Sequence, residues 1–401
     1  MEGYRGMVRV FEKFHITSMK ILFIGNINGI VFLNEHAKWL KEKLGPSTCI
    51  DIFSTVPLDK KKPSKSNYFN NKYFAYTNSI LSRIPGFKRY VIMPIRFLLL
   101  PNDYDIIHIQ YVSPFLKTVS PFFHFKAKKI IVTFWGSDFY SESDKTLRMI
   151  GKRILKKADL ITMGNPGVIT DFKKFFGHQF ILPQLCVFGN DSIEIFKAME
   201  QTPKVTSKTN FKLNPNKTTI TIGYNPAENN QHLAILDAIE ASELLSKLKD
   251  EIEFIIPFTY GGIKRYIQTV HSRLKKFPFN YKVIDTYLTM EELFHLRNAS
   301  DIFIHLPISD SISGSLREYL FTKNIVITGK WLPYKILDQN EIYYHSIAST
   351  NQLPDVLLNC VENLETERLK CTSNLANIYK ISSWKVVIND WVNLYNELLK
   401  N

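Results

Sequence analysis

A short segment in the second half of the chain combines small hydroxyl residues with two carboxylates. Residues 301–318 read DIFIHLPISDSISGSLRE, so an apolar strand should end near His305 and a helix should begin after the serine-rich loop. The first N–H groups of a helix have no partner within it, and its positive dipole end faces the loop. Small residues there, among them Ser313, Gly314 and Ser315, would let the backbone approach a diphosphate closely.

The two acids of this segment are Asp310 and Glu318, with seven residues between them. One should lie in the loop and the other about a turn into the helix. Carboxylates placed in this way could bind the hydroxyls of a sugar and of a ribose. A serine that caps an ordinary helix would give a similar pattern, so the segment alone leaves both interpretations open.

Two side chains in the first half of the chain are candidates for proton transfer. His108 ends a strand-like run and Asp138 follows another, at the edge where a parallel sheet presents side chains to ligands. Transfer of a group to a hydroxyl acceptor needs a carboxylate or imidazole that accepts the proton of that hydroxyl. Asp138 is therefore a candidate base, with a helix cap as the alternative. Packing within the strand is the alternative for His108.

The elements that would position these residues are strand-length apolar runs alternating with helical patterns. Expected strands in the first half are residues 19–25, 105–110, 129–133 and 159–163, with helices at 34–44, capped by Asn34, and at 147–157. Expected strands in the second half are 218–223, 253–256, 282–285, 301–305 and 325–328, with helices at 231–248, 263–276, 316–321 and 384–399. Such alternation predicts parallel sheets with helices on both faces.

The 401 residues suit two domains, and the lysine-rich polar stretch 201–217 has the composition of a linker. The predicted fold class is α/β, with two doubly wound, Rossmann-like domains facing a cleft that holds ligands at the carboxyl ends of both sheets. The expected parts are an extension (1–18), an N-terminal acceptor domain (19–200), the linker (201–217), a C-terminal donor domain (218–380) and a C-terminal helix (381–401) that could pack back on the first domain.

Composition and motif content limit the classes of partner and of reaction that fit this chain. The formal net charge of +14 favours anionic partners such as nucleic acid, an anionic membrane or phosphorylated substrates. Four scattered cysteines suggest a reducing cytosol, and no apolar run approaches the length of a membrane span. The dinucleotide, P-loop and nucleophile-elbow motifs do not occur, nor does metal-ligand spacing. We therefore expect neither a cofactor nor a metal site.

The order of motifs resembles the retaining glycosyltransferases of the GT-B type. The pair Asp310 and Glu318 resembles their Glu-x7-Glu element, with Asp310 in place of the first glutamate. The segments DYDIIHIQY, VTFWGSDFY, KKADLITMGN and CVFGNDSIEIF resemble, in order, further segments of that family. The resemblance covers nearly the whole chain from Met19 and implies transfer of a sugar from a nucleoside diphosphate sugar. The aspartate in place of glutamate shortens the reach to the sugar and leaves the retaining mechanism open.

The second half also resembles the lipid-linked 4-acetamido-4,6-dideoxygalactose transferases, which use dTDP sugars in enterobacterial common antigen assembly. The segments IGYNPAENNQHLAILDAI, IIPFTYGGIKRYIQTV, DTYLTMEELFHLRNASD and SISGSL carry this likeness. It implies that Asn225, Asn230 and His232 face the donor and that Tyr260 lies in the next loop. Turn formation, solvation and packing are the alternatives for these residues.

The resemblance implies a metal-independent hexosyl- or amino-deoxyhexosyltransferase that uses a dTDP or UDP sugar and a glycan or polyprenyl-linked acceptor in bacterial surface polysaccharide assembly. Without a metal, helix N-termini and cations must neutralise the leaving diphosphate, with Arg265 or Lys264 as the expected partner. The basic, apolar stretch 87–100 is either a membrane-surface segment or a buried helix. The expected location is cytoplasmic, with peripheral contact at the inner face of the membrane as a further option.

Two other functions remain as alternatives. A sugar-nucleotide epimerase or hydrolase could share the same shape without an acceptor site. A nucleic-acid-binding protein would fit the charge, but the chain has no recognised nucleic-acid-binding module, so we expect no nucleic acid partner.

Overall fold

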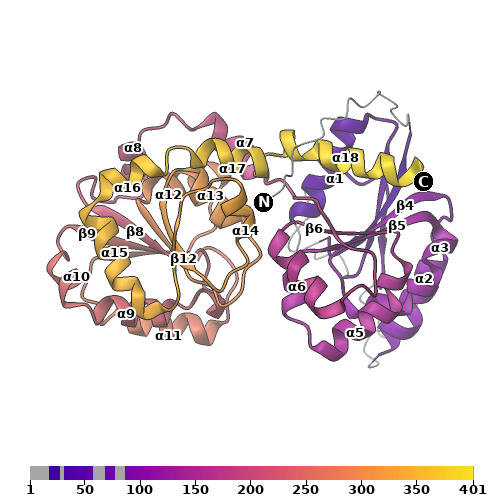
Figure 1. The fold of residues 1–401 in the computed structure, drawn as a ribbon, viewed down its shortest axis with the longest axis horizontal. Helices are drawn as coiled ribbons and strands as arrows, with labels where there is room; N and C mark the ends of the chain where they lie inside the picture. Colours follow the sequence, from indigo (N-terminus) through magenta and orange to yellow (C-terminus); the bar gives the residue numbers. More distant parts are fainter. Residues whose placement is uncertain (1–17, 28–30, 57–67, 77–85, 401) are drawn as a thin grey trace, which may run out of the picture.

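The computed structural model describes residues 18–27, 31–56, 68–76 and 86–400. All of the expected extension except Ser18 therefore lies outside the described residues. The described chain forms two lobes, each built on one parallel sheet, which lie side by side (Figure 1). We call the lobe with the earlier strands the first lobe and the other the second lobe.

The sheet of the first lobe has seven strands. Their spatial order is β3 (Lys72–Phe74), β2 (Cys49–Ser54), β1 (Lys20–Gly25), β4 (Tyr104–Gln110), β5 (Ala127–Phe134), β6 (Leu160–Met163) and β7 (Gln184–Leu185). The sheet of the second lobe has six. Their order is β10 (Tyr281–Ile284), β9 (Ile252–Pro257), β8 (Thr218–Ile222), β11 (Ile302–His305), β12 (Ile325–Gly329) and β13 (His345–Ile347).

Helices cover both faces of each sheet (Figure 1). Those of the first lobe are α1 (Val31–Leu44), α2 (Met93–Leu98), α3 (Phe123–Lys126), α4 (Ser137–Tyr140), α5 (Asp144–Arg153) and α6 (Pro166–Phe176), with the short helices η2 (Lys88–Ile92) and η3 (Pro114–Thr118). After α7 (Asp191–Ala198) come α8 (Lys204–Asn210), α9 (His232–Glu240), α10 (Glu243–Lys247), α11 (Lys264–Leu274), α12 (Met290–Ala299), α13 (Gly314–Phe321), α14 (Lys335–Gln339), α15 (Leu353–Glu362), α16 (Leu364–Lys370), α17 (Asn374–Ser382) and α18 (Trp384–Lys400).

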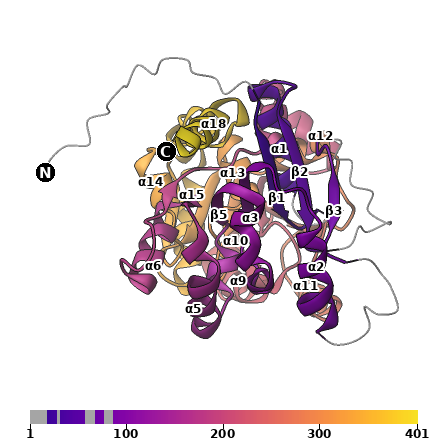
Figure 2. The ribbon, with the colours of Figure 1, turned by 90° about the vertical axis from the view of Figure 1, so that its right-hand side faces the viewer.

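Continuous apolar runs make the strands suitable for sheets that are buried on both faces. Along β1, successive side chains enter two different cores: Leu22 packs with residues of α2, α5 and α6, whereas Phe23 packs with residues of α1 and α18. The two faces of the sheet are therefore covered by separate sets of helices. Figure 2 views the first lobe from its outer side, with α2 and α5 at the lower end and α1 and α18 at the upper end.

The chain crosses between the lobes twice. The first crossing runs through α7, which packs on α12 and α13 of the second lobe. The amide of Asp191, at the start of α7, donates to Glu35 of α1 at 3.2 Å. The second crossing leads from α17 to α18, whose Trp384 and Trp391 are fully buried against the first lobe. The last helix therefore belongs to the core of the first lobe.

Three local features differ from the sequence-based expectations. Asn34 lies inside α1 rather than at its cap, because the helix begins three residues earlier. The expected helix 231–248 is divided into α9 and α10, and Ser242 caps α10 by accepting a hydrogen bond from Leu245 N at 3.3 Å. The expected linker 201–217 includes α8, where the aliphatic stem of Lys208 is buried and its ammonium group binds Asp301. No helix in the described part of the chain is long and apolar enough to cross a membrane.

Candidate functional site

Loops at the carboxyl ends of β8, β11 and β12 are joined by hydrogen bonds to form the floor of the candidate site. Asn229, in the loop after β8, donates to Ser309 O at 3.0 Å and accepts from Ser309 N at 3.1 Å. Trp331, after β12, donates from its indole to Pro307 O at 2.8 Å. The loop after β11 is therefore held on both sides by its neighbours.

Asp310 lies at the centre of this loop with its hydrogen-bonded oxygen facing inward. Its Oδ2 accepts from Tyr334 OH at 2.6 Å and from Ser313 N at 2.9 Å, and lies 3.4 Å from His305 Nε2. Burial acts to raise the pKa of Asp310, but these hydrogen bonds outweigh it and hold the pKa below its usual value. All of these contacts use Oδ2, so Oδ1 of an ionised carboxylate remains able to accept a hydroxyl from a ligand.

The N-terminus of α13 follows Asp310 directly and is capped by Ser313, whose hydroxyl accepts from Leu316 N at 3.4 Å. The preceding residue, Ile312, has a φ of 73°, a left-handed conformation that is rare for a β-branched residue and often marks a functional turn. Gly314 begins the helix. A Cβ at this position would lie 3.3 Å from Asn190 Nδ2 and 4.0 Å from Phe32 Cζ of the first lobe. The start of α13 is therefore close to both lobes.

Glu318, the second acid of the motif, is buried and fully hydrogen-bonded. Its Oε1 accepts from Ser192 Oγ at 2.8 Å and from Asn190 Nδ2 at 3.3 Å, and its Oε2 accepts from Arg297 Nε at 3.1 Å. Arg297 also donates to Ser315 Oγ at 3.3 Å. Glu318 thus joins α12, α13 and α7, and protein donors already occupy both oxygens that were expected to meet a ligand.

The two asparagines of the loop after β8 shape that loop. Asn225 Oδ1 accepts from Ala227 N at 3.0 Å and from Asn230 Nδ2 at 2.8 Å, which makes the turn. Asn230 is buried, and its Oδ1 has no hydrogen-bond partner among the described residues. Asn225 therefore forms the turn, which was the alternative role given for it above. A contact between Asn225 and a ligand would be in addition to this role.

His232 lies beneath this loop rather than at its surface. The ring is fully buried, its Nδ1 lies 3.4 Å from Tyr266 OH, and burial lowers its pKa to about 4. A Cβ at Gly223 would come within 2.8 Å of His232 Nε2, and Gly223 also has a φ of 63°. A neutral imidazole therefore packs against the end of β8, where only glycine leaves room for it.

Tyr260 connects the loop after β9 with the other loops of the site. Its side chain is 50% exposed, while its hydroxyl interacts with the side chains of Asn225 and Ser315. Partial burial raises its pKa, so the hydroxyl stays protonated at physiological pH. Arg265 is exposed in the first turn of α11, beyond the same loop, and its guanidinium makes no ion pair or hydrogen bond with another described residue. It is therefore available to a ligand.

Asp138 of the first lobe shapes the turn that meets this site. Its carboxylate accepts from Val112 N at 2.8 Å, Trp135 N at 2.8 Å and Gly136 N at 3.0 Å, and burial raises its pKa to about 7. The side chain is only 1% exposed. The structure therefore presents Asp138 as a loop-shaping residue, and the expectation of an accessible base is not met.

The turn that Asp138 shapes touches the second lobe. Gly136 has a φ of 105°, and a Cβ on it would lie 2.4 Å from Ser311 Cβ, in the loop next to Asp310. Gly167, at the start of α6, comes similarly close to Pro333 in the loop after β12. The carboxyl ends of the two sheets therefore face each other across the interface between the lobes.

His108 does not reach this interface, which corrects the expectation that it is a catalytic residue. The ring is fully buried beneath α18, with Nδ1 2.5 Å from Tyr395 OH and Nε2 2.6 Å from Thr133 Oγ1. Burial lowers its pKa to about 3, so the ring is neutral. A strand position two residues before the end of β4 is covered by helices on both faces, and the packing alternative is the correct one.

Several side chains that orient the acids of the site were not predicted from the sequence. Tyr334 and His305 orient Asp310, while Arg297 and Asn190 orient Glu318. A histidine at the end of a strand was a usable signal for His305. The others could not be found from spacing, because their partners lie in distant elements. No group of three or more potential metal ligands occurs within the described ranges.

Comparisons with known proteins agree with this geometry. A family model described as Glycosyl transferase 4-like matches residues 20–165, within the first lobe. No curated protein matches the sequence.

Solved structures match almost the whole chain at low sequence identity. HepE from Anabaena in complex with UDP has a TM-score of 0.74 at 12% identity, covering 94% of this chain and 100% of its own. Sucrose-phosphate synthase from Thermosynechococcus elongatus has a TM-score of 0.75 at 11% identity, covering 95% and 99%. A glycosyltransferase from Rickettsia africae has a TM-score of 0.71 at 15% identity, covering 96% and 99%. The predicted fold class is confirmed: the chain has the GT-B fold, with two Rossmann-like lobes facing each other.

Proposed function

We propose that this protein is a glycosyltransferase that takes a sugar from a nucleoside diphosphate donor bound at the start of α13. The observation that carries the proposal is the loop from Asp310 to Gly314, which combines an ionised carboxylate, a capped helix N-terminus and a glycine beside the other lobe. The Glycosyl transferase 4-like match and the likeness to HepE, solved with UDP and with UDP-glucose, support a nucleotide sugar as donor.

In this proposal the diphosphate lies against the first amides of α13, where Ser313 and Ser315 add hydroxyl groups. Fixed dipoles and cations aimed at the leaving diphosphate stabilise the charge that develops as the sugar departs. Arg265 or Lys264, at the start of α11, adds a positive charge without a metal ion. Asp310 Oδ1 accepts a hydrogen bond from a hydroxyl group of the donor sugar. The half-exposed ring of Tyr260 offers a stacking surface for a uracil or thymine ring.

The first lobe would hold the acceptor, and its turn at Gly136 brings that acceptor to the sugar. Because Asp138 is buried and accepts three backbone N–H groups, it acts in this proposal as a positioning residue and not as a base. The donor is a dTDP or UDP sugar, and the transferred group is a hexose or an amino-deoxyhexose. The acceptor is a glycan on a polyprenyl carrier in surface polysaccharide assembly.

A lipid-linked acceptor is supported by an apolar patch on the first lobe. The patch consists of Tyr90, Val91, Ile95, Leu98 and Leu99, which are 39–78% exposed along η2 and α2. The opposite side of the same helices, with Met93 and Phe97, is buried. The segment is therefore amphipathic, with one buried side and one exposed apolar side. The exposed side supports the membrane-surface alternative given for stretch 87–100.

The charge of the chain is concentrated in the same lobe. Residues 19–200 contain 26 Lys and Arg against 14 Asp and Glu, whereas residues 201–401 contain 22 against 21. A basic lobe with an exposed apolar patch fits peripheral binding to an anionic membrane at the cytoplasmic face. The purified protein should sediment with vesicles that contain anionic phospholipid, and Leu99→Asp should weaken this binding. Equal sedimentation of both proteins would contradict the membrane proposal.

The donor site is tested by thermal shift with UDP, dTDP and their hexose conjugates. We expect at least one nucleotide to raise the Tm, and Asp310→Asn to weaken binding of the sugar conjugate by about tenfold, or ~1.4 kcal/mol, while binding of the nucleotide alone is kept. Asp338→Asn is a matched control, because Asp338 also accepts a tyrosine hydroxyl, from Tyr344 at 2.7 Å, but on the surface. No shift with any nucleotide would refute the proposal. Release of nucleotide without an acceptor would favour an epimerase or hydrolase.

A further inference from the structure

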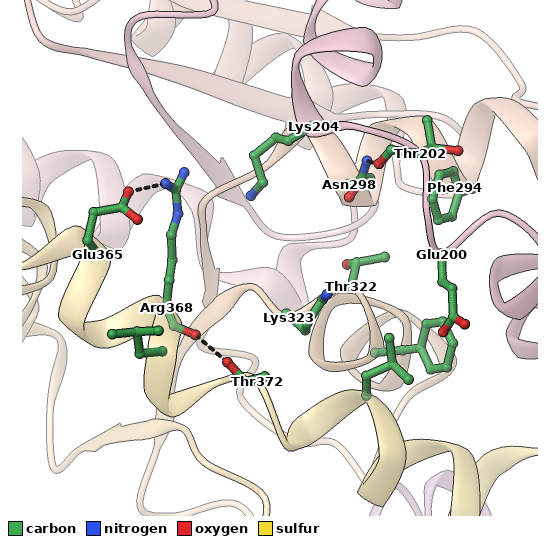
Figure 3. A pocket seen from close by; sticks show the side chains of 13 residues that line it. Glu200, Thr202, Lys204, Phe294, Asn298, Thr322, Lys323, Glu365, Arg368 and Thr372 are labelled. Atoms are coloured by element: carbon green, nitrogen blue, oxygen red, sulfur yellow. Dashed lines mark hydrogen bonds and ion pairs between the residues drawn. The ribbon is translucent and has the colours of Figure 1, made fainter.

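A second cavity lies on the second lobe, away from the candidate donor site. Its volume is about 400 Å³, and it is lined by parts of α8, α12, α13 and α16 (Figure 3). Thr322 and Lys323 in its wall stand between the end of α13 and the start of β12. The cavity therefore opens at the amino ends of the strands, whereas the candidate donor site is at their carboxyl ends.

The cavity contains more positive than negative charge. The fully buried carboxylate of Asp301 accepts from Lys204 Nζ at 2.8 Å, from Lys208 Nζ at 2.9 Å and from Arg368. One carboxylate therefore faces three cations, and the exposed Lys323 adds a fourth beside them. Two further carboxylates line the cavity: Glu365, which also binds Arg368, and Glu200, which binds Lys197. Burial, together with the neighbouring Arg368 and Lys208, lowers the pKa of Lys204. An added anion would relieve this mutual repulsion.

The remaining lining indicates what kind of anion would fit. Thr202, Thr372 and Asn298 supply hydroxyl and amide groups, and Phe294, Phe321 and Leu369 supply an apolar side. In Figure 3 the side chains of Lys204 and Arg368 point toward the same space from different elements. Mixed lining and a volume of this size are typical of sites for small organic ligands. We propose that this cavity binds a phosphate-bearing small molecule, with Lys204, Lys323 and Arg368 around the phosphate.

The chain segments next to both crossings between the lobes line this cavity. Glu200, Thr202 and Lys204 belong to the segment that leads from α7 into α8, and Arg368 and Thr372 belong to the segment that leads through α17 to α18. A ligand that contacts both segments would fix their separation. Because α7 and α17 continue from these segments into the covalent connections between the lobes, the occupied cavity favours one relative position of the lobes over others.

Calorimetry with inorganic phosphate and with glucose 6-phosphate, both in the presence of saturating UDP, tests the proposal. We expect glucose 6-phosphate to bind despite the UDP and to bind more tightly than phosphate alone. Lys323→Glu should weaken this binding at least tenfold, because it reverses a charge that makes no ion pair or side-chain hydrogen bond with another described residue. Lys249→Glu is the matched control, an exposed lysine elsewhere on the same lobe, and should change the affinity less than twofold.

Three results would overturn the site: no binding of glucose 6-phosphate to the wild-type protein, displacement of the ligand by UDP, or equal weakening in the two variants. The effect on the lobes is measured separately by small-angle X-ray scattering. The ligand should change the radius of gyration of the wild-type protein and of Lys249→Glu, but not that of Lys323→Glu. An unchanged radius in the liganded wild-type protein would overturn the coupling to the lobes.

Discussion

Asp310 and Glu318 show how residues of one chemical type take different roles through their surroundings. Asp310 keeps one carboxylate oxygen without a donor among the described residues, so it can bind a ligand. Glu318 accepts from three side chains and balances Arg297, which is 2% exposed. Their spacing predicted that both carboxylates belong to one site, but it did not predict this difference. The donors Arg297 and Ser192 lie 21 and 126 positions from Glu318, in helices whose packing no local pattern encodes.

Replacing Glu318 by glutamine should destabilise the protein strongly. The change leaves the buried guanidinium of Arg297 without its counter-charge, which typically costs about 3–5 kcal/mol. The loss is measured as a decrease in the free energy of unfolding in urea. Glu240→Gln breaks a comparable pair with Arg273 on the surface and should cost at most about 1 kcal/mol. Similar losses in the two variants would show that the buried pair has no special role.

At the scale of elements, the apolar runs predicted the central strands well. The expected strand 218–223 is β8 (Thr218–Ile222), and the expected strand 325–328 is β12 (Ile325–Gly329). The edge strands β3, β7 and β13 were missed, because two or three residues give no pattern and form strands only by pairing with a neighbour. The inner strand β2 (Cys49–Ser54) was also missed, because Asp51 interrupts its apolar run. The contact between turns of the two lobes could not be predicted from the sequence either. Nothing local to Gly136 indicates that Ser311 will lie against it.

Replacing Gly136 by alanine should separate these turns. Its φ of 105° is unfavourable for alanine, and the new methyl group would lie 2.4 Å from Ser311 Cβ. We expect turnover to fall by at least tenfold while nucleotide binding to the second lobe remains. Gly164→Ala is a matched control, because a Cβ there meets no atom closer than 3.8 Å. Full activity of Gly136→Ala in a transfer assay would contradict the close approach.

At the scale of the whole molecule, two buried acids near the interface between the lobes have raised pKa values. Burial, and then the nearby Asp191, raise the pKa of Glu35 to about 7, and burial raises that of Asp138 to the same value. In the unfolded chain such acids titrate near pH 4. Between pH 4 and pH 7 the folded protein binds more protons than the unfolded chain. The contribution of these two groups to the free energy of unfolding is therefore full below about pH 4 and is lost as the pH rises toward 7.

The pH dependence should therefore be weaker in Glu35→Gln than in the wild-type protein. Each such group changes the free energy of unfolding by up to about 1.4 kcal/mol per pH unit between its two pKa values. The slope of this free energy between pH 5 and 7, from urea titrations, should become less negative in the variant, because glutamine does not titrate. An identical slope in the two proteins would show that Glu35 is ionised in the folded state.

The position of α18 has a consequence for how the chain is made. Most of the first lobe is synthesised before the second lobe, yet Trp384, Trp391 and Tyr395, which complete one face of its core, leave the ribosome only after the whole second lobe. At roughly 5–20 residues per second, the nearly 200 residues in between take about 10–40 s to translate. Throughout that time the nascent first lobe exposes the apolar surface of α1 to water and to chaperones. The second lobe, whose sheet and helices α8–α17 emerge earlier, can complete its core before the first lobe does.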